Sequence, residues 1–186
     1  ILDGQVSLDG VAYTKPSQNV DGDIPLHIPE QKTQRPRVDL PVVYEDPDIK
    51  VVIKPAGMLV HPTSANQAEA TVVDAIVAET TDDDAVRPGI VHRLDRNTSG
   101  LIVLAKSKAA KDYMQKQFSE RKVKKTYLML VVGHLKETEA IVRVPLARSR
   151  THPLKRVADP HGKTAETAYR VLESIGNYDL VEAKPT

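Results

Sequence analysis

Short apolar runs of strand length constrain the fold of this chain more than any other feature. Beyond residue 41 these runs are rich in valine, isoleucine and leucine, and glycine, proline or charged residues separate them. We expect strands within six stretches, the first of which holds two strands around a turn: 42–57, 100–107, 124–133, 140–146, 163–174 and 178–185. No apolar run reaches the roughly 18 residues that a membrane-spanning helix needs.

Two further segments have the periodicity of helices. Residues 71–79 place their valines and Ile76 on one side. Residues 108–121 follow Ser107, which we expect to cap the helix. The predicted inward stripe of this second helix, with most lysines outside, is Ala110, Tyr113, Met114, Gln117 and Phe118. Because strands and helices follow no regular βαβ order, the predicted fold class is α+β with a mixed or antiparallel sheet.

The chain divides by composition into three parts. At 186 residues it has room for one medium domain with a small appendage. Residues 1–32 hold short alternating runs broken by Asp-Gly pairs, which suits strands and tight turns, but too few apolar residues for a core. Residues 33–41 contain two prolines and are predicted to be a linker. Residues 42–186 form the predicted main domain.

The charge of the chain is unevenly distributed although its net charge is only +1. Residues 1–46 hold four Lys/Arg against eight Asp/Glu, residues 100–130 eight against two, and residues 143–170 seven against two. This asymmetry favours a polyanion partner for one face, and solvated helix faces are the alternative. The chain has no cysteine, which excludes disulfides and thiolate chemistry and fits the cytoplasm, where we expect the protein.

The stretch HRLDRNTSG at residues 92–100 has the strongest chemical character. Asp95 lies between Arg93 and Arg96, and adjacent cations keep a carboxylate ionised. An ionised carboxylate can act as a nucleophile at a sugar carbon. The alternative interpretation is a capped turn with surface ion pairs. No dinucleotide-binding glycine motif and no metal-ligand spacing of histidines is present, so we expect neither an organic cofactor nor a metal.

Four sequence blocks, in order, resemble the RluA-type pseudouridine synthases. GIVHRLDRNTSGLIVLAKS is similar to the family signature HRLDxxTSG with its following strand. VVIKPAGMLVHP, KVKKTYLMLVVGH and GKTAETAYRVLE are similar to three further family blocks, so that the resemblance covers about residues 42–183. Residues 1–32 resemble the second half of an S4 domain, a small RNA-binding module. An S4 domain before this catalytic domain is the layout of the ribosomal large-subunit pseudouridine synthases of the D type.

The resemblance implies an RNA-modifying isomerase that needs no cofactor. Such enzymes detach uracil from C1′ of selected uridines and rejoin it through C5. The family role of Asp95 is attack on C1′ or removal of the C2′ proton, and that of Tyr127 is to stack on the base and help remove the C5 proton. We expect RNA contacts from four basic residues: Arg93, Arg96, Lys106 and Lys125. His92 is expected to be a hydrogen-bonding support behind the loop.

One departure from the family pattern concerns the end of the sequence. The family block Gly-Arg-x-His-Gln-Ile-Arg would follow VEAKPT, where the sequence stops at Thr186. We therefore expect a segment of a longer protein, with a partial S4-like piece at residues 1–32 and a catalytic domain that is incomplete at its C-terminal end. Three alternatives stay open: a non-catalytic RNA-binding module or inactive fragment, a transfer RNA pseudouridine synthase, and a glycoside hydrolase, which would want a second carboxylate near Asp95.

Overall fold

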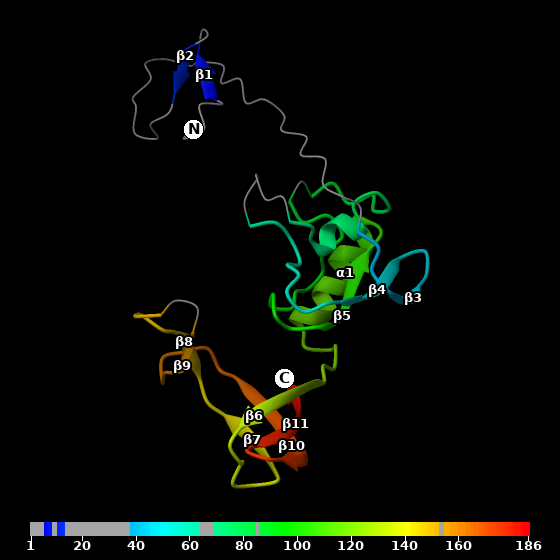
Figure 1. Cartoon of the computed structure of the whole chain (residues 1–186). Coiled ribbons are helices and arrows are strands. Elements are labelled where there is room, and N and C mark those ends of the chain that lie inside the picture. The colour runs from blue at the N-terminus through cyan, green and yellow to red at the C-terminus, as the bar shows by residue number, and fades with distance from the viewer. Residues whose placement is uncertain (1–5, 9–10, 14–37, 64–68, 85, 153–154) are drawn as a thin grey trace. The chain divides into compact units, whose positions relative to one another are not determined.

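The computed structural model describes residues 6–8, 11–13, 38–63, 69–84, 86–152 and 155–186. The chain splits into two units, Ile1–Lys111 and Asp112–Thr186, and this division falls inside the predicted main domain. Near the N-terminus, strands β1 (Val6–Leu8) and β2 (Val11–Tyr13) pair antiparallel (Figure 1). The rest of the predicted S4-like piece and most of the predicted linker lie outside the described residues.

The first unit contains a three-stranded antiparallel sheet in the order β3-β4-β5. Its strands are β3 (Val42–Glu45), β4 (Ile49–Lys54) and β5 (Gly100–Ala105). An isolated bridge between Ile90 and Leu104 adds the segment before HRLDRNTSG to the free edge of β5. The nine-residue motif therefore leaves one side of β5 and returns to the first residue of the same strand.

The core of the first unit lies between this sheet and the segment that follows Thr71. Val52, Ile102 and Leu104 from the sheet are fully buried, together with Val72 and Ile76. The helix predicted at residues 71–79 is only a 3-10 helix, η1 (Val72–Ala75). Its β-branched residues disfavour a continuous α-helix, which explains the difference.

Helix α1 (Lys108–Ser119) begins as the sequence predicts. The backbone N–H of Ala110 donates to Oγ of Ser107 at 3.2 Å, which confirms the cap. The predicted inward stripe is wrong at one position, because Tyr113 is 63% exposed. Lys111, expected outside, is buried instead, and the reason is a pair of aspartates described below.

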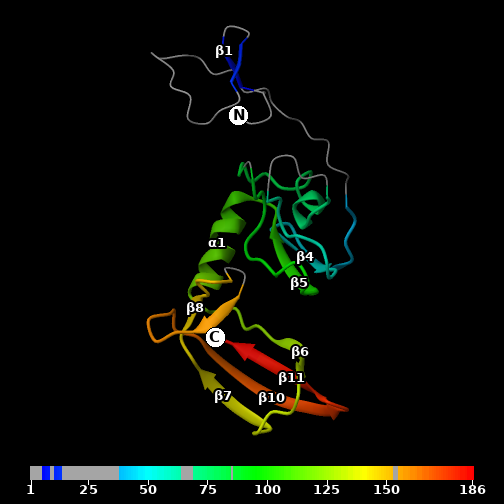
Figure 2. The ribbon, with the colours of Figure 1, turned by 60° about the vertical axis from the view of Figure 1, so that its left-hand side comes forward.

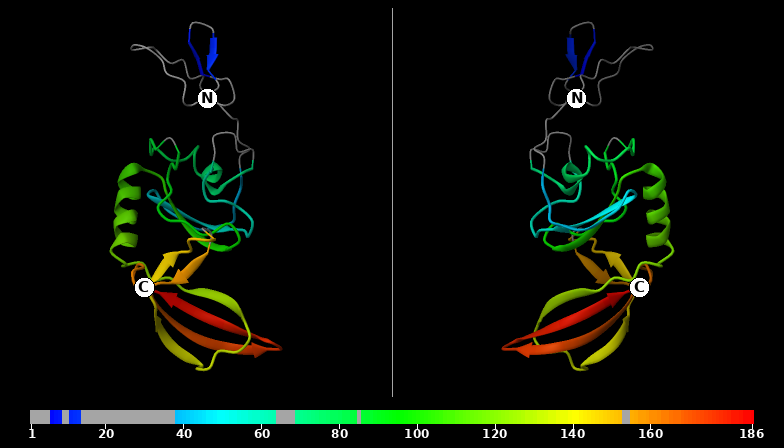
Figure 3. Two further views of the ribbon diagram at one scale, coloured as in Figure 1. Left: turned by 90° about the vertical axis from the view of Figure 1, so that its left-hand side faces the viewer. Right: turned by 90° about the vertical axis from the view of Figure 1, so that its right-hand side faces the viewer.

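The second unit contains a four-stranded antiparallel sheet in the order β6-β11-β10-β7 (Figure 2). Its strands are β6 (Tyr127–Val132), β7 (Glu139–Arg143), β10 (Glu166–Ile175) and β11 (Tyr178–Pro185). Figure 3 shows the long β10–β11 hairpin. A separate hairpin joins β8 (Leu146–Arg148) and β9 (Arg156–Ala158), two strands that the sequence did not predict.

The described architecture confirms the α+β prediction. Every strand pair is antiparallel, and helices are few. Across the residues covered by the structure, no helix is both long enough and apolar enough to span a bilayer.

Candidate active site

Asp95 lies on a turn that a neighbouring loop holds in place. The N–H of Thr98 donates to the carbonyl of Asp95 at 3.1 Å and closes the turn. Gly57 and Arg96 bind each other reciprocally: the Gly57 N–H donates to the Arg96 carbonyl at 2.8 Å, and Arg96 Nε donates to the Gly57 carbonyl at 2.9 Å. Asp95 itself is exposed, so a substrate can reach its carboxylate while hydrogen bonds hold the backbone carbonyls of Asp95 and Arg96.

Lys54 supports the same turn from the interior. Its side chain is fully buried at the end of β4. Its Nζ donates to the carbonyls of Pro55, Met58 and Arg96 at 2.9, 2.8 and 2.9 Å. Burial lowers the pKa of Lys54, and the negative charge of Asp95 opposes that shift. The sequence analysis missed this residue, although the alternation of β4 places Lys54 on the same face as buried Val52.

The two arginines beside Asp95 differ in their surroundings. Arg96 Nη2 lies 3.0 Å from Oε2 of Glu69, so its guanidinium is shared between that carboxylate and Gly57. Arg93 is exposed, and within the described part of the chain no ion pair is recorded for it. Of the two, Arg93 is therefore better placed to meet an anionic substrate.

Two histidines are related to the motif in different ways. His92 is its first residue, whereas His61 lies earlier in the chain and is affected by the charge of Arg93. Nε2 of His92 accepts a hydrogen bond from the N–H of Val103 at 2.9 Å, which confirms its predicted supporting role. His61 is buried, and its Nδ1 has no hydrogen-bond partner among the residues that the structure covers. Burial, together with the charges of Arg87 and Arg93, lowers the pKa of His61 and favours its neutral form. Nothing in the sequence analysis singled out His61.

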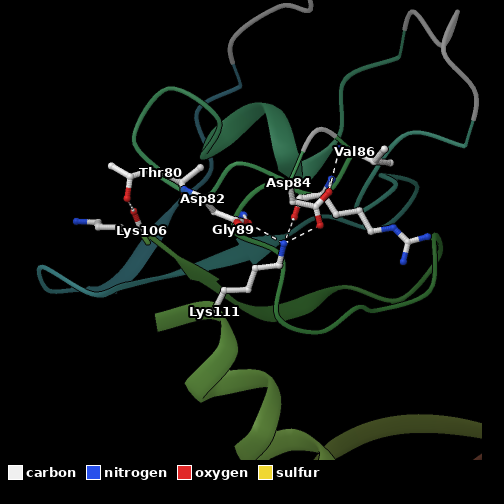
Figure 4. Close-up of polar contacts among 9 residues, drawn as sticks. Thr80, Asp82, Asp84, Val86, Gly89, Lys106 and Lys111 are labelled. Atoms are coloured by element: carbon white, nitrogen blue, oxygen red, sulfur yellow. Dashed lines mark hydrogen bonds and ion pairs between the residues drawn. The ribbon is translucent and has the colours of Figure 1, made fainter. Parts of the chain in front are cut away.

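Two aspartates of the acidic stretch before the motif, Asp82 and Asp84, bind the buried side chain of Lys111 (Figure 4). We call this arrangement the Lys111 anchor. Lys111 Nζ donates to Asp82 Oδ2 at 2.6 Å, to Asp84 Oδ2 at 2.8 Å and to the Arg87 carbonyl at 3.0 Å. Asp82 Oδ2 also accepts the N–H of Gly89 at 2.8 Å. The first turn of α1 therefore fixes the segment that enters the motif.

These contacts shift the titration of both carboxylates. Burial acts to raise the pKa of Asp82, but its bonds from Lys111 and Gly89 outweigh burial and lower it. The bond from Lys111 and two backbone N–H groups hold the pKa of Asp84 well below its usual range. Both aspartates are therefore charged at neutral pH, as the Lys111 anchor requires.

The remaining predicted site residues lie in different environments. Lys106 Nζ is 2.6 Å from Oε1 of Glu45, so this lysine is engaged in an ion pair. Lys125 and Tyr127 belong to the second unit, whereas Asp95 belongs to the first. Tyr127 begins β6, is partly buried and pairs with Ala183 of β11. No cluster of three or more potential metal ligands occurs within the described ranges.

Residues 48–186 match the family model described as RNA pseudouridylate synthase. The chain belongs to the RNA pseudouridylate synthase family. It is 36% identical over 196 residues to an uncharacterized RNA pseudouridine synthase of Aquifex aeolicus, covering 99% of this chain and 61% of that protein. It is 37% identical over 169 residues to the ribosomal large subunit pseudouridine synthase D of Zymomonas mobilis, covering 87% of this chain and 52% of that protein.

Solved structures agree with this family membership. The human RNA pseudouridylate synthase domain containing 4 matches with a TM-score of 0.60 and 26% identity, over 77% of this chain and 58% of that one. The chain thus spans about half to three fifths of the length of the curated relatives and the structure named here. The RluA-type resemblance of the four sequence blocks is consistent with these matches.

Proposed function

We propose that this protein is an RNA pseudouridine synthase in which Asp95 is the catalytic carboxylate. The observation that carries the proposal is the anchored turn: Asp95 is exposed, while Lys54 and Gly57 both bind the backbone of the next residue, Arg96. A fixed backbone beneath an accessible carboxylate is what positioning a sugar for reaction requires. The match to the family over residues 48–186 supports the same activity.

The proposed reaction is an isomerisation, so its atoms balance within one nucleotide. The bond between uracil N1 and C1′ breaks, the base turns, and a bond forms between C5 and C1′. C5 then gives up its proton, and N1 ends with a proton. Asp95 either attacks C1′ to form a covalent intermediate or removes the C2′ proton. Tyr127 is proposed to stack on the base and to help take the C5 proton.

Four basic residues are proposed to contact the RNA: Arg93, Arg96, Lys106 and Lys125. Arg96 and Lys106 already pair with Glu69 and Glu45, so a phosphate would have to share their donors. Arg93 has no such competitor among the described residues, and we expect it to contribute most. The uridine must leave its stack to reach Asp95, and phosphate contacts offset that cost.

The proposed substrate is large-subunit ribosomal RNA in the cytoplasm. Relatives named ribosomal large subunit pseudouridine synthase D support it, at 37% identity in Zymomonas mobilis and 38% in Nitrosomonas europaea. Transfer RNA is the alternative substrate, and the experiment below includes both. The S4-like piece proposed at residues 1–32 would add a second RNA contact.

The test is tritium release from RNA labelled at uridine C5. Ribosomal and transfer RNA are incubated with the protein, with Asp95→Asn and with Asp83→Asn, a control that removes an exposed carboxylate of the same unit. Because C5 must lose its hydrogen, we expect release by the wild type and by the control, and none by Asp95→Asn. Absence of release from both RNAs by the wild type would contradict the proposed activity.

A further inference from the structure

The end of helix α1 has an unusual backbone at Arg121. The φ angle of Arg121 is 57°, which makes it the one non-glycine residue with positive φ in the described chain. Its N–H donates to the Phe118 carbonyl at 3.1 Å, and the N–H of Lys122 donates to the Gln117 carbonyl at 2.9 Å. This pair of bonds is the helix ending at which glycine is usual. Arginine is strained there, and backbone outliers of this kind cluster at functional sites.

Arg121 lines two adjoining pockets of the second unit. The smaller has a volume of about 250 Å³, and among the residues that line it are Lys124, Lys125 and Lys184. The larger has a volume of about 380 Å³ and includes Arg143 in its wall. Arg121 and Thr186 line both pockets, so the two spaces lie next to the same two residues.

The cations around these pockets differ in whether a carboxylate neutralises them. Within the described residues, no ion pair is recorded for Arg121, Lys124 or Lys125. Lys122, the immediate neighbour, lines neither pocket and lies 2.5 Å from Oε2 of Glu120. Three of the five cations that line the pockets are thus without an ion pair in the described part of the chain. The other two are paired: Arg143 Nε lies 2.6 Å from Oε2 of Glu166, which also lines the larger pocket, and Lys184 Nζ lies 2.8 Å from Oε1 of Glu182.

We propose that these two pockets form a groove for the phosphodiester backbone of single-stranded RNA, with Arg121 between two successive phosphates. A guanidinium presents a planar fork of donors that matches phosphate oxygens, and the lysines add charge on one side. The hydroxyls of Thr126 and Thr164 supply further donors on the two walls. The groove rests on the proposed function. It assigns RNA contacts to Arg121 and Lys124, beyond the four residues proposed above, and to Lys184, whose Nζ a phosphate would share with Glu182.

The test uses a change that acts oppositely on stability and on binding. Arg121→Gly removes the backbone strain, and we expect it to raise Tm by about 2–4 °C. The same change removes a phosphate contact, and we expect it to raise Kd for a fluorescein-labelled single-stranded RNA about five- to tenfold. The slope of log K against log salt should fall by about 0.7. Lys124→Ala, which leaves the backbone unstrained, should weaken binding in the same direction.

The control and the contrary results separate this groove from the proposed activity. Lys122→Ala removes one charge at the next residue and should leave Kd within about twofold of the wild type. If wild type releases tritium while Arg121→Gly and Lys124→Ala keep wild-type Kd and salt slope, the groove is wrong and the activity stands. If wild type neither binds RNA nor releases tritium, both proposals are wrong. A loss of affinity equal to that of Lys122→Ala would also overturn the groove, because it would reflect net charge alone.

Discussion

The two units of the chain differ in how they are held together. In the first unit, sheet and loops bury a set of valines, isoleucines and leucines, and Ile102 and Leu104 have no exposed surface. In the second, Val181 and Ala183 are the only apolar residues of the described part that are buried, and Leu130 of β6 is 60% exposed. The proposed catalytic carboxylate therefore lies on the well-packed unit, and the proposed tyrosine lies on an open sheet.

The two units also differ in which polar groups they bury. The first unit buries three lysines, and among them Lys54 and Lys111 are each bonded to three oxygens. Lys54 donates to carbonyls at and beside the Asp95 turn, and Lys111 donates to the segment before the motif. The second unit buries Asp179, which accepts hydrogen bonds from His134, Ser174 and the N–H of Leu135. Because buried polar groups are costly unless bonded, these networks specify one arrangement of each unit.

After the complete loss expected for Asp95→Asn, the largest effect is expected at Tyr127. Tyr127→Phe keeps the ring but removes the hydroxyl, so kcat for tritium release should fall about 100-fold or more while RNA affinity changes little. Tyr113→Phe, at a position 63% exposed on α1, is the matched control and should retain activity. A wild-type kcat for Tyr127→Phe would remove this residue from the chemistry.

A pair of leucine truncations tests the difference in packing. Leu104→Ala empties a fully buried position of β5 and should lower the free energy of unfolding by about 3 kcal/mol. Leu130→Ala, at an exposed position of β6, should cost less than about 1 kcal/mol. Urea denaturation measures both. Equal losses would show that the second unit is better packed than its exposed surface indicates.

Alanine substitutions at two glycines compare the cost of a steric clash with the cost of an unfavourable φ angle alone. Gly89 has φ of 69°, and a Cβ there would lie 2.6 Å from the Ala105 carbonyl. Gly57 has φ of 85° with no atom within 4 Å of such a Cβ. Gly89→Ala should cost about 2 kcal/mol or more and Gly57→Ala about 1 kcal/mol, as thermal unfolding would show. The reverse order would contradict the anchored path into the motif.

The smallest effect concerns acid stability of the second unit. Bonds from Ser174, His134 and Leu135 lower the pKa of Asp179 to about 2. A lowered carboxyl pKa contributes stability that is complete above the unfolded pKa of about 3.9 and is lost as the pH falls toward the folded pKa. Unfolding followed from pH 5 to pH 2 should therefore be flatter in Asp179→Asn than in the wild type. Glu173→Gln, an exposed control, should leave the slope unchanged.

Local patterns predicted much of the fold, and long-range partners account for what they missed. The Ser107 cap and the strands around residues 42–57 and 100–107 depend on neighbouring residues, and they were found. Lys111 was placed outside because its aspartates lie 27 and 29 residues earlier in the chain. Periodicity contains no information about such pairing.

The candidate site shows the same limit. Asp95 stood out because its neighbours Arg93 and Arg96 are adjacent in sequence. The support from Lys54 became visible only when β4 was placed beside the turn, 42 residues away. The strained φ of Arg121 is likewise a property of the folded helix end that the residue type does not reveal.

The most direct test of the central claim is product analysis. RNA incubated with the wild type or with Asp95→Asn is digested to nucleosides and separated by chromatography. The account predicts that wild type produces pseudouridine and that Asp95→Asn, still folded by its circular dichroism spectrum and Tm, produces none. Pseudouridine formed by folded Asp95→Asn at the wild-type rate would contradict the assignment of Asp95 as the catalytic carboxylate.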